Sequence, residues 1–453
     1  MKHLLAIVNF VLVLTLLAAC SAPAALSPTP TSPTTKPPTS PTAAPLPTAA
    51  QPVPASVAVS NKPRNTSPAA KPADLSQLVS GNSAFAFDLY QNLLDGQTGN
   101  LFYSPYSISL AFAMVQAGAK GDTLSQINKA LHYTLDGSSL HQAFNALQLY
   151  LANHAASMDQ PDQKDYTLNI ANATWGQAGY QFLPAYLDVL AENYGAGMRL
   201  VDFKNDTEKT RLMINDWVSQ QTNKKILDLI PQGSLDAMTR LVLTNAIYFN
   251  AAWTHTFQKS ATAADTFNNL DASKSSVPMM HQQADFGYAK GDGYQAVNLP
   301  YSGGKLSMLM IVPDAGKFGS FEKSLNLAQV ESIRKALGPA NVNLSMPKFR
   351  VESSFSLGSA LQKLGLVDAF NASKADLSGM DGTHDLSVTG VLHKSYVNVD
   401  EDGTEAAAAT AIIVGLTSMP TNTVELKIDR PFIFLIQDTD TGAILFMGRV
   451  TTL

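Results

Sequence analysis

The chain has 453 residues, of which 45% are hydrophobic and 15% are charged, and its formal net charge is −5. This composition is typical of a protein with a buried apolar core, and no run of basic residues is longer than a pair, so we expect no nucleic acid partner. The pair Lys224-Lys225 is interpreted as the solvated end of a helix. The single cysteine, Cys20, excludes an intramolecular disulfide.

Residues 1–19 have the features of an export signal. Lys2 and His3 precede an apolar run that ends at Leu17. This run is shorter than the roughly 20 residues that a membrane-spanning helix needs, so a signal peptide is favoured over a transmembrane helix. Residues 17–20 (LAAC) resemble the lipobox of bacterial lipoproteins, in which the cysteine becomes the acylated first residue. The resemblance implies an exported protein that is lipid-anchored at the bacterial cell surface through Cys20.

The next segment, residues 20–73, is expected to be an extended tether. After Cys20 it consists almost entirely of Pro, Ser, Thr and Ala. Such a sequence buries too little apolar surface to offset the entropy of ordering. The tether would hold the folded part of the chain, residues 74–453, away from the membrane.

Residues 74–453 have the pattern of one large domain. Ser104 followed by Pro105 predicts the start of a helix, and Thr123 with Gln126 has the spacing of a capping box. Short apolar runs predict buried strands, the last two joined as a hairpin: 241–249, 307–312, 432–437 and 443–447. Helices dominate early, strands dominate late and no internal linker is visible, so we expect a single α+β domain.

Local enzyme signatures are absent from the sequence. It has no Gly-x-Ser-x-Gly elbow, no phosphate-binding glycine loop, no His-Glu-x-x-His and no paired cysteines. Gly291 and Gly293 form a lone pair that is typical of a turn. A catalytic triad is recognised by geometry, so the sequence does not test for one. We expect a protein that is not an enzyme and that uses no cofactor or metal.

Residues 401–418, EDGTEAAAATAIIVGLTS, include no cysteine or histidine, so the backbone is the candidate working part. We interpret the segment as one that can leave solvent and become a β-strand. Because strand side chains alternate between faces, Thr404 and every second residue after it would share one face. Glu405 would then fall on the face that can stay in water. A helix or loop is the alternative, since alanine is the best helix former, but the alanine-rich part is shorter than the roughly 12 residues at which an isolated helix becomes marginal.

Separated motifs follow one another along residues 74–453. They are 100–107 (NLFYSPYS), 214–219 (INDWVS) with Lys225-Ile226, 243–249 (LTNAIYF) with Trp253, 277–280 (VPMM), 391–394 (VLHK), 401–409, 430–432 (RPF) and 446–448 (FMG). Together they resemble the serpin (serine protease inhibitor) family in the family's own order. With its lipobox, the chain resembles a bacterial lipoprotein-type member of that family.

The resemblance implies the serpin fold, with a dominant β-sheet, smaller sheets, surrounding helices and an exposed reactive loop. It implies an irreversible suicide-substrate inhibitor of serine endopeptidases, in which the cleaved loop inserts into the main sheet and traps the acyl-enzyme. The native state would be metastable, because insertion releases strain stored in an incomplete sheet. The family implies a monomer whose partner is a target protease. A non-inhibitory serpin acting as a surface binding or carrier protein, or an inhibitor of papain-like cysteine proteases, is the alternative.

The resemblance also assigns individual residues. In inhibitory serpins the inward face of the loop hinge is small and uncharged, and this chain meets that demand. The polar cluster under the centre of the sheet is matched by Ser104, Ser107, Asn245 and His393, and the point where insertion begins by Trp253. A buried histidine needs hydrogen-bond partners, which this cluster would supply. The hinge is assigned to Glu401, Gly403, Thr404, Glu405, Ala406, Ala407, Ala408, Ala409 and Thr410.

Family spacing from Glu401 places the bond that the protease cleaves at Thr417-Ser418, with Leu416-Thr417 as the alternative one residue earlier. Threonine before the cut does not suit trypsin-like proteases, whose pocket binds Arg or Lys. A small β-branched residue preceded by Leu416 favours elastase-like or subtilisin-like serine proteases. The alternative bond would make chymotrypsin-like targets suitable.

Overall fold

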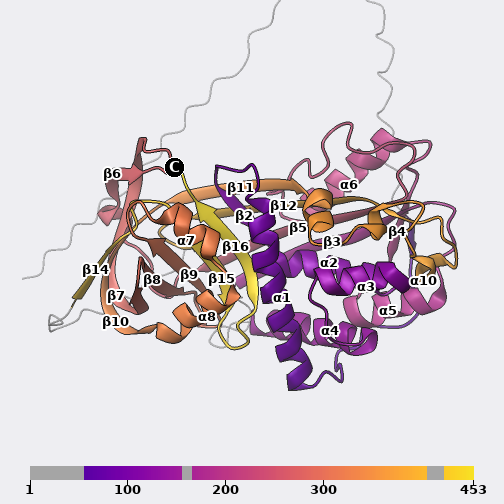
Figure 1. Cartoon of the computed structure of the whole chain (residues 1–453), viewed down its shortest axis with the longest axis horizontal. Coiled ribbons are helices and arrows are strands. Elements are labelled where there is room, and N and C mark those ends of the chain that lie inside the picture. Colours follow the sequence, from indigo (N-terminus) through magenta and orange to yellow (C-terminus); the bar gives the residue numbers. More distant parts are fainter. Residues whose placement is uncertain (1–55, 156–165, 406–422) are drawn as a thin grey trace, which may run out of the picture. The chain divides into compact units, whose positions relative to one another are not determined.

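The computed structural model describes residues 56–155, 166–405 and 423–453. These residues form two β-sheets with helices packed around them, which confirms the expected α+β class (Figure 1). The α-helices are α1 (Pro72–Leu93), α2 (Pro105–Gln116), α3 (Gly121–Ala130), α4 (Gly137–His154), α5 (Pro184–Tyr194), α6 (Thr207–Gln221), α7 (Phe318–Ser324), α8 (Leu327–Ala336), α9 (Gly358–Lys363) and α10 (Ser378–Asp381), with short 3-10 turns at Lys259–Ala261 and Asp368–Phe370.

Among the described residues, the first sheet has seven strands, and it carries the candidate site. Its long central strands, β3, β5 and β12, run across the middle of Figure 1. In spatial order the strands are β1 (Ser56–Ala58), β4 (Met198–Val201), β3 (Tyr166–Gln177), β5 (Leu241–Ala252), β13 (Gly403–Thr404), β12 (Val388–Val399) and β11 (Phe349–Ser356).

Both faces of this sheet are covered by helices. Along β5, Leu243 and Ile247 belong to the main core together with residues of α2, whereas Val242 and Ala246 belong to a second apolar cluster with residues of α6. Because strand side chains alternate, these two sets face opposite sides of the sheet. A strand added to this sheet would therefore have one face toward α2 and one toward α6.

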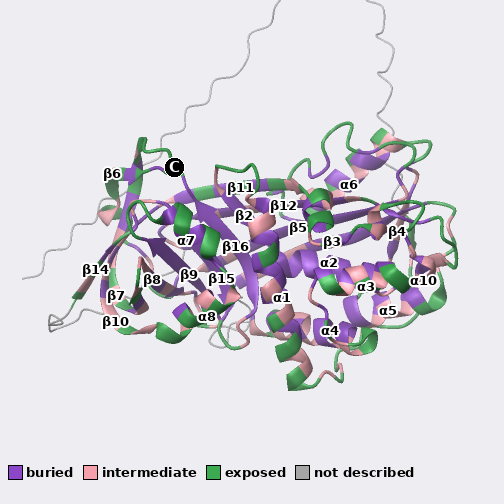
Figure 2. Cartoon of the chain, in the orientation of Figure 1, coloured by how far each residue is buried: buried purple, intermediate pink, exposed green. Residues whose placement is uncertain are grey.

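The second sheet has nine strands within the part of the chain that the structure describes. β9, β15 and β16 are buried along their whole length (Figure 2). The predicted runs 241–249, 307–312, 432–437 and 443–447 fall in β5, β9 and the β15–β16 hairpin, so those predictions are confirmed. In spatial order the strands are β14 (Thr423–Lys427), β10 (Gly338–Pro347), β7 (Lys274–Gly291), β8 (Tyr294–Pro300), β9 (Leu306–Pro313), β15 (Phe432–Asp438), β16 (Ile444–Val450) and β2 (Leu101–Tyr103), with β6 (Ala263–Asn268) paired to β7.

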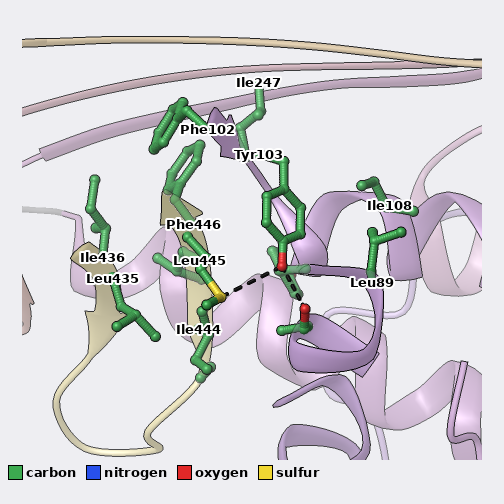
Figure 3. Close-up of a cluster of buried hydrophobic side chains, with 14 of the residues drawn as sticks. Leu89, Phe102, Tyr103, Ile108, Ile247, Leu435, Ile436, Ile444, Leu445 and Phe446 are labelled. Carbon is green, nitrogen blue, oxygen red and sulfur yellow. Dashed lines mark hydrogen bonds between the residues drawn. The ribbon is translucent and has the colours of Figure 1, made fainter. Parts of the chain in front are cut away.

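Aromatic packing joins the two sheets into one core. Phe446 of β16 lies 5.7 Å from Phe249 of β5, measured between ring centroids, and stacks on Phe102 of β2 with 5.1 Å between the centroids. Close by, the Tyr103 hydroxyl donates a 2.5 Å hydrogen bond to the carbonyl of Ala86 in α1. Figure 3 shows these rings between β16 and Ile247 of the first sheet. The core therefore holds β5 against the second sheet.

Local signals predicted one helix start correctly and one wrongly. The Ser104 hydroxyl accepts a hydrogen bond from the Ser107 amide, and Pro105 opens α2 as expected. Thr123 is not an N-cap, because α3 begins at Gly121, and its hydroxyl instead accepts a hydrogen bond from the Asp376 amide. The predicted capping box at Thr123 is wrong because a tertiary contact occupies the side chain.

Residues 56–67, which we call the N-terminal arm, are bound to the domain although the sequence assigned them to the tether. Within the arm, β1 pairs antiparallel with β4 at the edge of the first sheet. Arg64 donates hydrogen bonds of 2.9 Å to Asn145 and 2.8 Å to Gln148 on α4. The arm thus contacts both the sheet edge and the helical layer.

Candidate functional site: the junction of β5, β12 and β13

The central strands β5 and β12 are direct neighbours along only part of their length. They pair in parallel up to Ile247 opposite Ser395. Beyond that point β13 lies between them, with Thr404 opposite both Ala251 of β5 and Val399 of β12. Two residues of the hinge segment are therefore already present as a strand, antiparallel to both neighbours.

Gly403 fits this position because it has no side chain. Its φ is +155°, and a Cβ at this residue would lie 2.1 Å from the carbonyl oxygen of Ala251. Any other residue would push β13 away from β5. The structure thus gives a steric reason for the glycine assigned to the hinge.

The side chain of Thr404 is fully buried. Its hydroxyl lies 2.6 Å from the hydroxyl of Tyr301, and Tyr301 stacks on Trp253 with 4.5 Å between the ring centroids. The Trp253 indole donates a 3.0 Å hydrogen bond to the Asp400 carbonyl. The structure therefore places Trp253 beside the first residues of the hinge.

The hinge begins at a buried carboxylate. Glu401 accepts hydrogen bonds from the ammonium of Lys348 at 2.7 Å and the hydroxyl of Thr262 at 2.8 Å. Burial alone would raise the pKa of Glu401, but these hydrogen bonds outweigh it and hold that pKa below its usual value. The ion pair between Glu401 and Lys348 holds the chain in place just before β13 begins.

Glu405 follows Thr404 directly after the end of β13 and contacts the opposite side of the sheet. Its carboxylate pairs with Lys225, which follows α6, whereas Thr404 contacts Tyr301 in the main core. The side chain of Glu405 is only 11% exposed in this conformation. The expectation that its face can stay in water concerns the longer, inserted strand and stays a prediction. The Glu405 carboxylate is paired with Lys225 on the α6 side of the sheet and is not mainly solvated by water.

Several assigned residues lie outside the described ranges. They are the hinge residues Ala406, Ala407, Ala408, Ala409 and Thr410, the bond candidates Leu416, Thr417 and Ser418, and the lipidation candidate Cys20.

The four polar residues predicted to cluster do meet under the sheet. The Ser104 amide donates a 3.2 Å hydrogen bond to Nε2 of His393, whose Nδ1 is paired with the side-chain oxygen of Asn245. The Asn245 amide donates a 2.6 Å hydrogen bond to the Ser107 hydroxyl. Since Nε2 accepts, the proton of the neutral ring sits on Nδ1. Burial lowers the pKa of His393 to about 3.

The sequence reasoning missed one member of this cluster, Asn172. Its side-chain oxygen accepts hydrogen bonds from the Ser107 hydroxyl at 2.9 Å and from the Asn245 amide at 2.6 Å. The available signal was an asparagine inside the strand-like run 166–177, directly opposite Asn245 on β5. The cluster therefore links α2 to β3, β5 and β12.

Across residues 56–155, 166–405 and 423–453, no three His, Cys, Asp or Glu side chains group as metal ligands. Within the same ranges no helix is long and apolar enough to cross a membrane.

These observations define an α+β protein whose main sheet receives the first residues of a loop between two central strands. Residues 80–453 match the family model described as Serpin (serine protease inhibitor), and the chain belongs to the serpin family. It is 39% identical over 386 residues to leukocyte elastase inhibitor A of Rattus norvegicus, covering 83% of this chain and 99% of that protein. An uncharacterised serpin-like protein of Thermococcus kodakarensis is 39% identical over 376 residues, which cover 82% of this chain and 85% of that protein.

Solved structures agree with this assignment. The thermophilic serpin tengpin in its native state matches with a TM-score of 0.77 and 27% identity over 88% of this chain and all (100%) of that chain. Uncleaved ovalbumin matches with a TM-score of 0.74 and 26% identity over 83% of this chain and 100% of its own. The expected serpin fold is confirmed.

Proposed function

We propose that this serpin is an irreversible suicide-substrate inhibitor of serine endopeptidases. The catalytic serine oxygen of the protease would attack the carbonyl carbon of Thr417, the peptide bond to Ser418 would break, and the new amine would leave with a proton. The protease would remain joined to Thr417 as an ester. The cleaved loop would then continue β13 between β5 and β12 and carry the protease with it before water hydrolyses the ester.

The observation that carries the proposal is the register of β13. Continuing its antiparallel pairing with β5 from Thr404 opposite Ala251 would bring Thr410 opposite Asn245. Continuing its pairing with β12 from Thr404 opposite Val399 would bring Thr410 opposite His393. Asn245 and His393 are already opposite each other, so both neighbours specify one and the same register for a longer strand.

Residue size supports the same conclusion. Thr404, Ala406, Ala408 and Thr410 would share the face toward α2, where the core is tightly packed. None of these side chains is large or charged, so none opposes insertion. A non-inhibitory carrier would not need small, uncharged residues on this face. The carrier function is therefore the second candidate.

The target class is proposed from the loop and from the relatives. Relatives named leukocyte elastase inhibitor are 39% identical to this chain. Thr417 before the cut, with Leu416 behind it, suits elastase-like or subtilisin-like serine proteases. Cleavage at Leu416-Thr417 by a chymotrypsin-like protease and inhibition of a papain-like cysteine protease are the alternative outcomes of the test.

Incubation with an elastase-like and a subtilisin-like protease tests the function. We expect a 1:1 covalent complex that survives denaturation with SDS. The Thr404→Arg variant should still be cleaved but should form no complex, because a buried position would have to accept a charge. Cleavage of the wild-type loop with full turnover by every protease tried would exclude the inhibitor.

The location is proposed as the bacterial cell surface. Residues 1–19 would be removed as a signal peptide, Cys20 would carry the acyl chains, and residues 20–73 would include the tether to a monomeric serpin domain at 74–453. Cys20→Ala should move the protein out of the membrane fraction. Unchanged fractionation would refute acylation at Cys20.

A further inference from the structure

Lys225 forms an ion pair with Glu405, the residue that follows β13. Its sequence context gave no hint of this contact. It lies in the loop that follows α6, where its amide donates a 2.9 Å hydrogen bond to the Thr222 carbonyl. Its ammonium reaches across to Glu405, which is 180 positions away in the sequence. The hydrogen bond with Glu405 raises the pKa of Lys225. The residue is thus paired and is not simply a solvated helix end.

The backbone of Glu405 is held as firmly as its side chain. Its amide donates a 2.8 Å hydrogen bond to the Asn398 carbonyl on β12. Its own carbonyl accepts a hydrogen bond from the Asn250 side chain on β5. Glu405 is therefore anchored to both strands that would flank an inserted loop.

The conformation of Glu405 ends the strand at Thr404. Its φ is +53°, in the left-handed region that residues other than glycine rarely adopt. An extended strand needs a strongly negative φ, so β13 stops here. Continuation of the strand requires this one residue to return to the extended conformation.

The carboxylate of Glu405 depends on Lys225. One of its oxygens, Oε2, is buried without a hydrogen-bond partner among the described residues, and the other is paired with Lys225. The Tyr248 hydroxyl also interacts with this carboxylate by hydrogen bonding and Tyr396 lies nearby, but neither residue supplies a positive charge. A largely buried carboxylate that loses its cation is strongly disfavoured, so without Lys225 the group would move to solvent and take the end of β13 with it.

We propose that Lys225 is a positioning residue for loop insertion, and this inference rests on the proposed function. Its ion pair with Glu405 holds Gly403 and Thr404 between β5 and β12, in the register that a longer strand would continue. Glu405 must still return to the extended conformation, but a strand that starts from two residues already placed between its neighbours has less conformational entropy left to lose than one that starts from none, so we expect faster insertion with the ion pair than without it. Loss of the pair would slow insertion without changing how the protease recognises the bond.

The test compares Lys225→Gln with Lys224→Gln, the neighbouring lysine, as the matched control. Each protein is nicked in the loop with a protease that is not trapped, and the rate at which it becomes heat-resistant is followed, because insertion completes the sheet. We expect a several-fold slower rise for Lys225→Gln and no change for Lys224→Gln. The exchanged pair Lys225→Glu with Glu405→Lys should recover most of the rate.

The outcomes separate the two proposals. If the nicked wild type becomes heat-resistant and Lys225→Gln does so at the same rate, Lys225 has no positioning role although insertion occurs. If the nicked wild type never becomes heat-resistant, loop insertion itself fails and the role of Lys225 falls with it. A slower rate that the exchanged pair does not recover would show that Lys225 acts through some contact other than Glu405, which also overturns the inference.

Discussion

Nδ1 of His393 and the side-chain oxygen of Asn245 are hydrogen-bonded directly across the ladder between β12 and β5. Neighbouring strands lie about 4.8 Å apart, so a strand placed between these two would roughly double their separation. The hydrogen bond must then break. Both residues are fully buried, and each would lose a partner unless the new strand supplies one.

Thr410 is predicted to supply that partner. If the register of β13 continued, it would bring the Thr410 hydroxyl to the level of His393 and Asn245, on the face toward the cluster. Thr410→Val should leave the cleaved, inserted form less stable by about 1–3 kcal/mol, the usual cost of unpaired buried polar groups. Thr410→Ser keeps the hydroxyl and should stay close to the wild type. Denaturant unfolding of the cleaved proteins measures this, and equal stability of the valine and serine variants would contradict the register.

Gly403 should not tolerate even a methyl group. Gly403→Ala places a Cβ 2.1 Å from the Ala251 carbonyl oxygen, so β13 should leave its seat and uncover Thr404. Gly390→Ala on β12 is the matched control, because a Cβ there meets nothing within 4 Å. We expect faster proteolysis after Glu401 and a loss of about 1–3 kcal/mol in native stability for the first variant only. Identical behaviour of the two variants would argue against a seated hinge.

Stability should fall as the pH drops below about 6.5, where an unfolded histidine takes up a proton. Burial lowers the pKa of His393 to about 3 and that of His141 to about 4, so the folded protein keeps both rings neutral through this range. The unfolded state then binds more protons, and the free energy of unfolding declines by up to about 1.4 kcal/mol per pH unit for each histidine. Urea unfolding from about pH 6.5 to about pH 5, above the pKa values of unperturbed carboxylates, measures the slope. His393→Gln should remove about half of it, and an unchanged slope would show that this ring is not buried neutral.

Local features of this structure were predicted correctly from the sequence. Alternation along 401–418 placed Thr404 inward, and Ser104 capped α2 as its residue type predicts. The arm was missed because it continues a Pro-, Ser- and Thr-rich segment, and β1 has only 3 residues, too few to show a strand pattern. The contact of Lys225 with Glu405 was missed because it joins positions 180 residues apart.

Docking of the arm can be tested at Gly197. A Cβ there would lie 2.6 Å from the Ala58 carbonyl oxygen, so Gly197→Val should lift β1 from β4. Gly99→Ala, where a Cβ meets nothing within 4 Å, is the control. We expect faster proteolysis within residues 56–67 and a loss of about 1–2 kcal/mol in stability. Cleavage of the arm at the wild-type rate would show that the pairing of β1 with β4 does not hold the arm on the domain.

Trapping of the protease is tested most directly by the mass of the denatured product formed with a subtilisin-like or elastase-like protease. We expect one species in which the protease is joined through its catalytic serine to Thr417, with the fragment that begins at Ser418 released on denaturation. An ester at Leu416 would move the bond by one residue and leave the mechanism intact. Recovery of fully active protease together with two unlinked fragments of the serpin would contradict it.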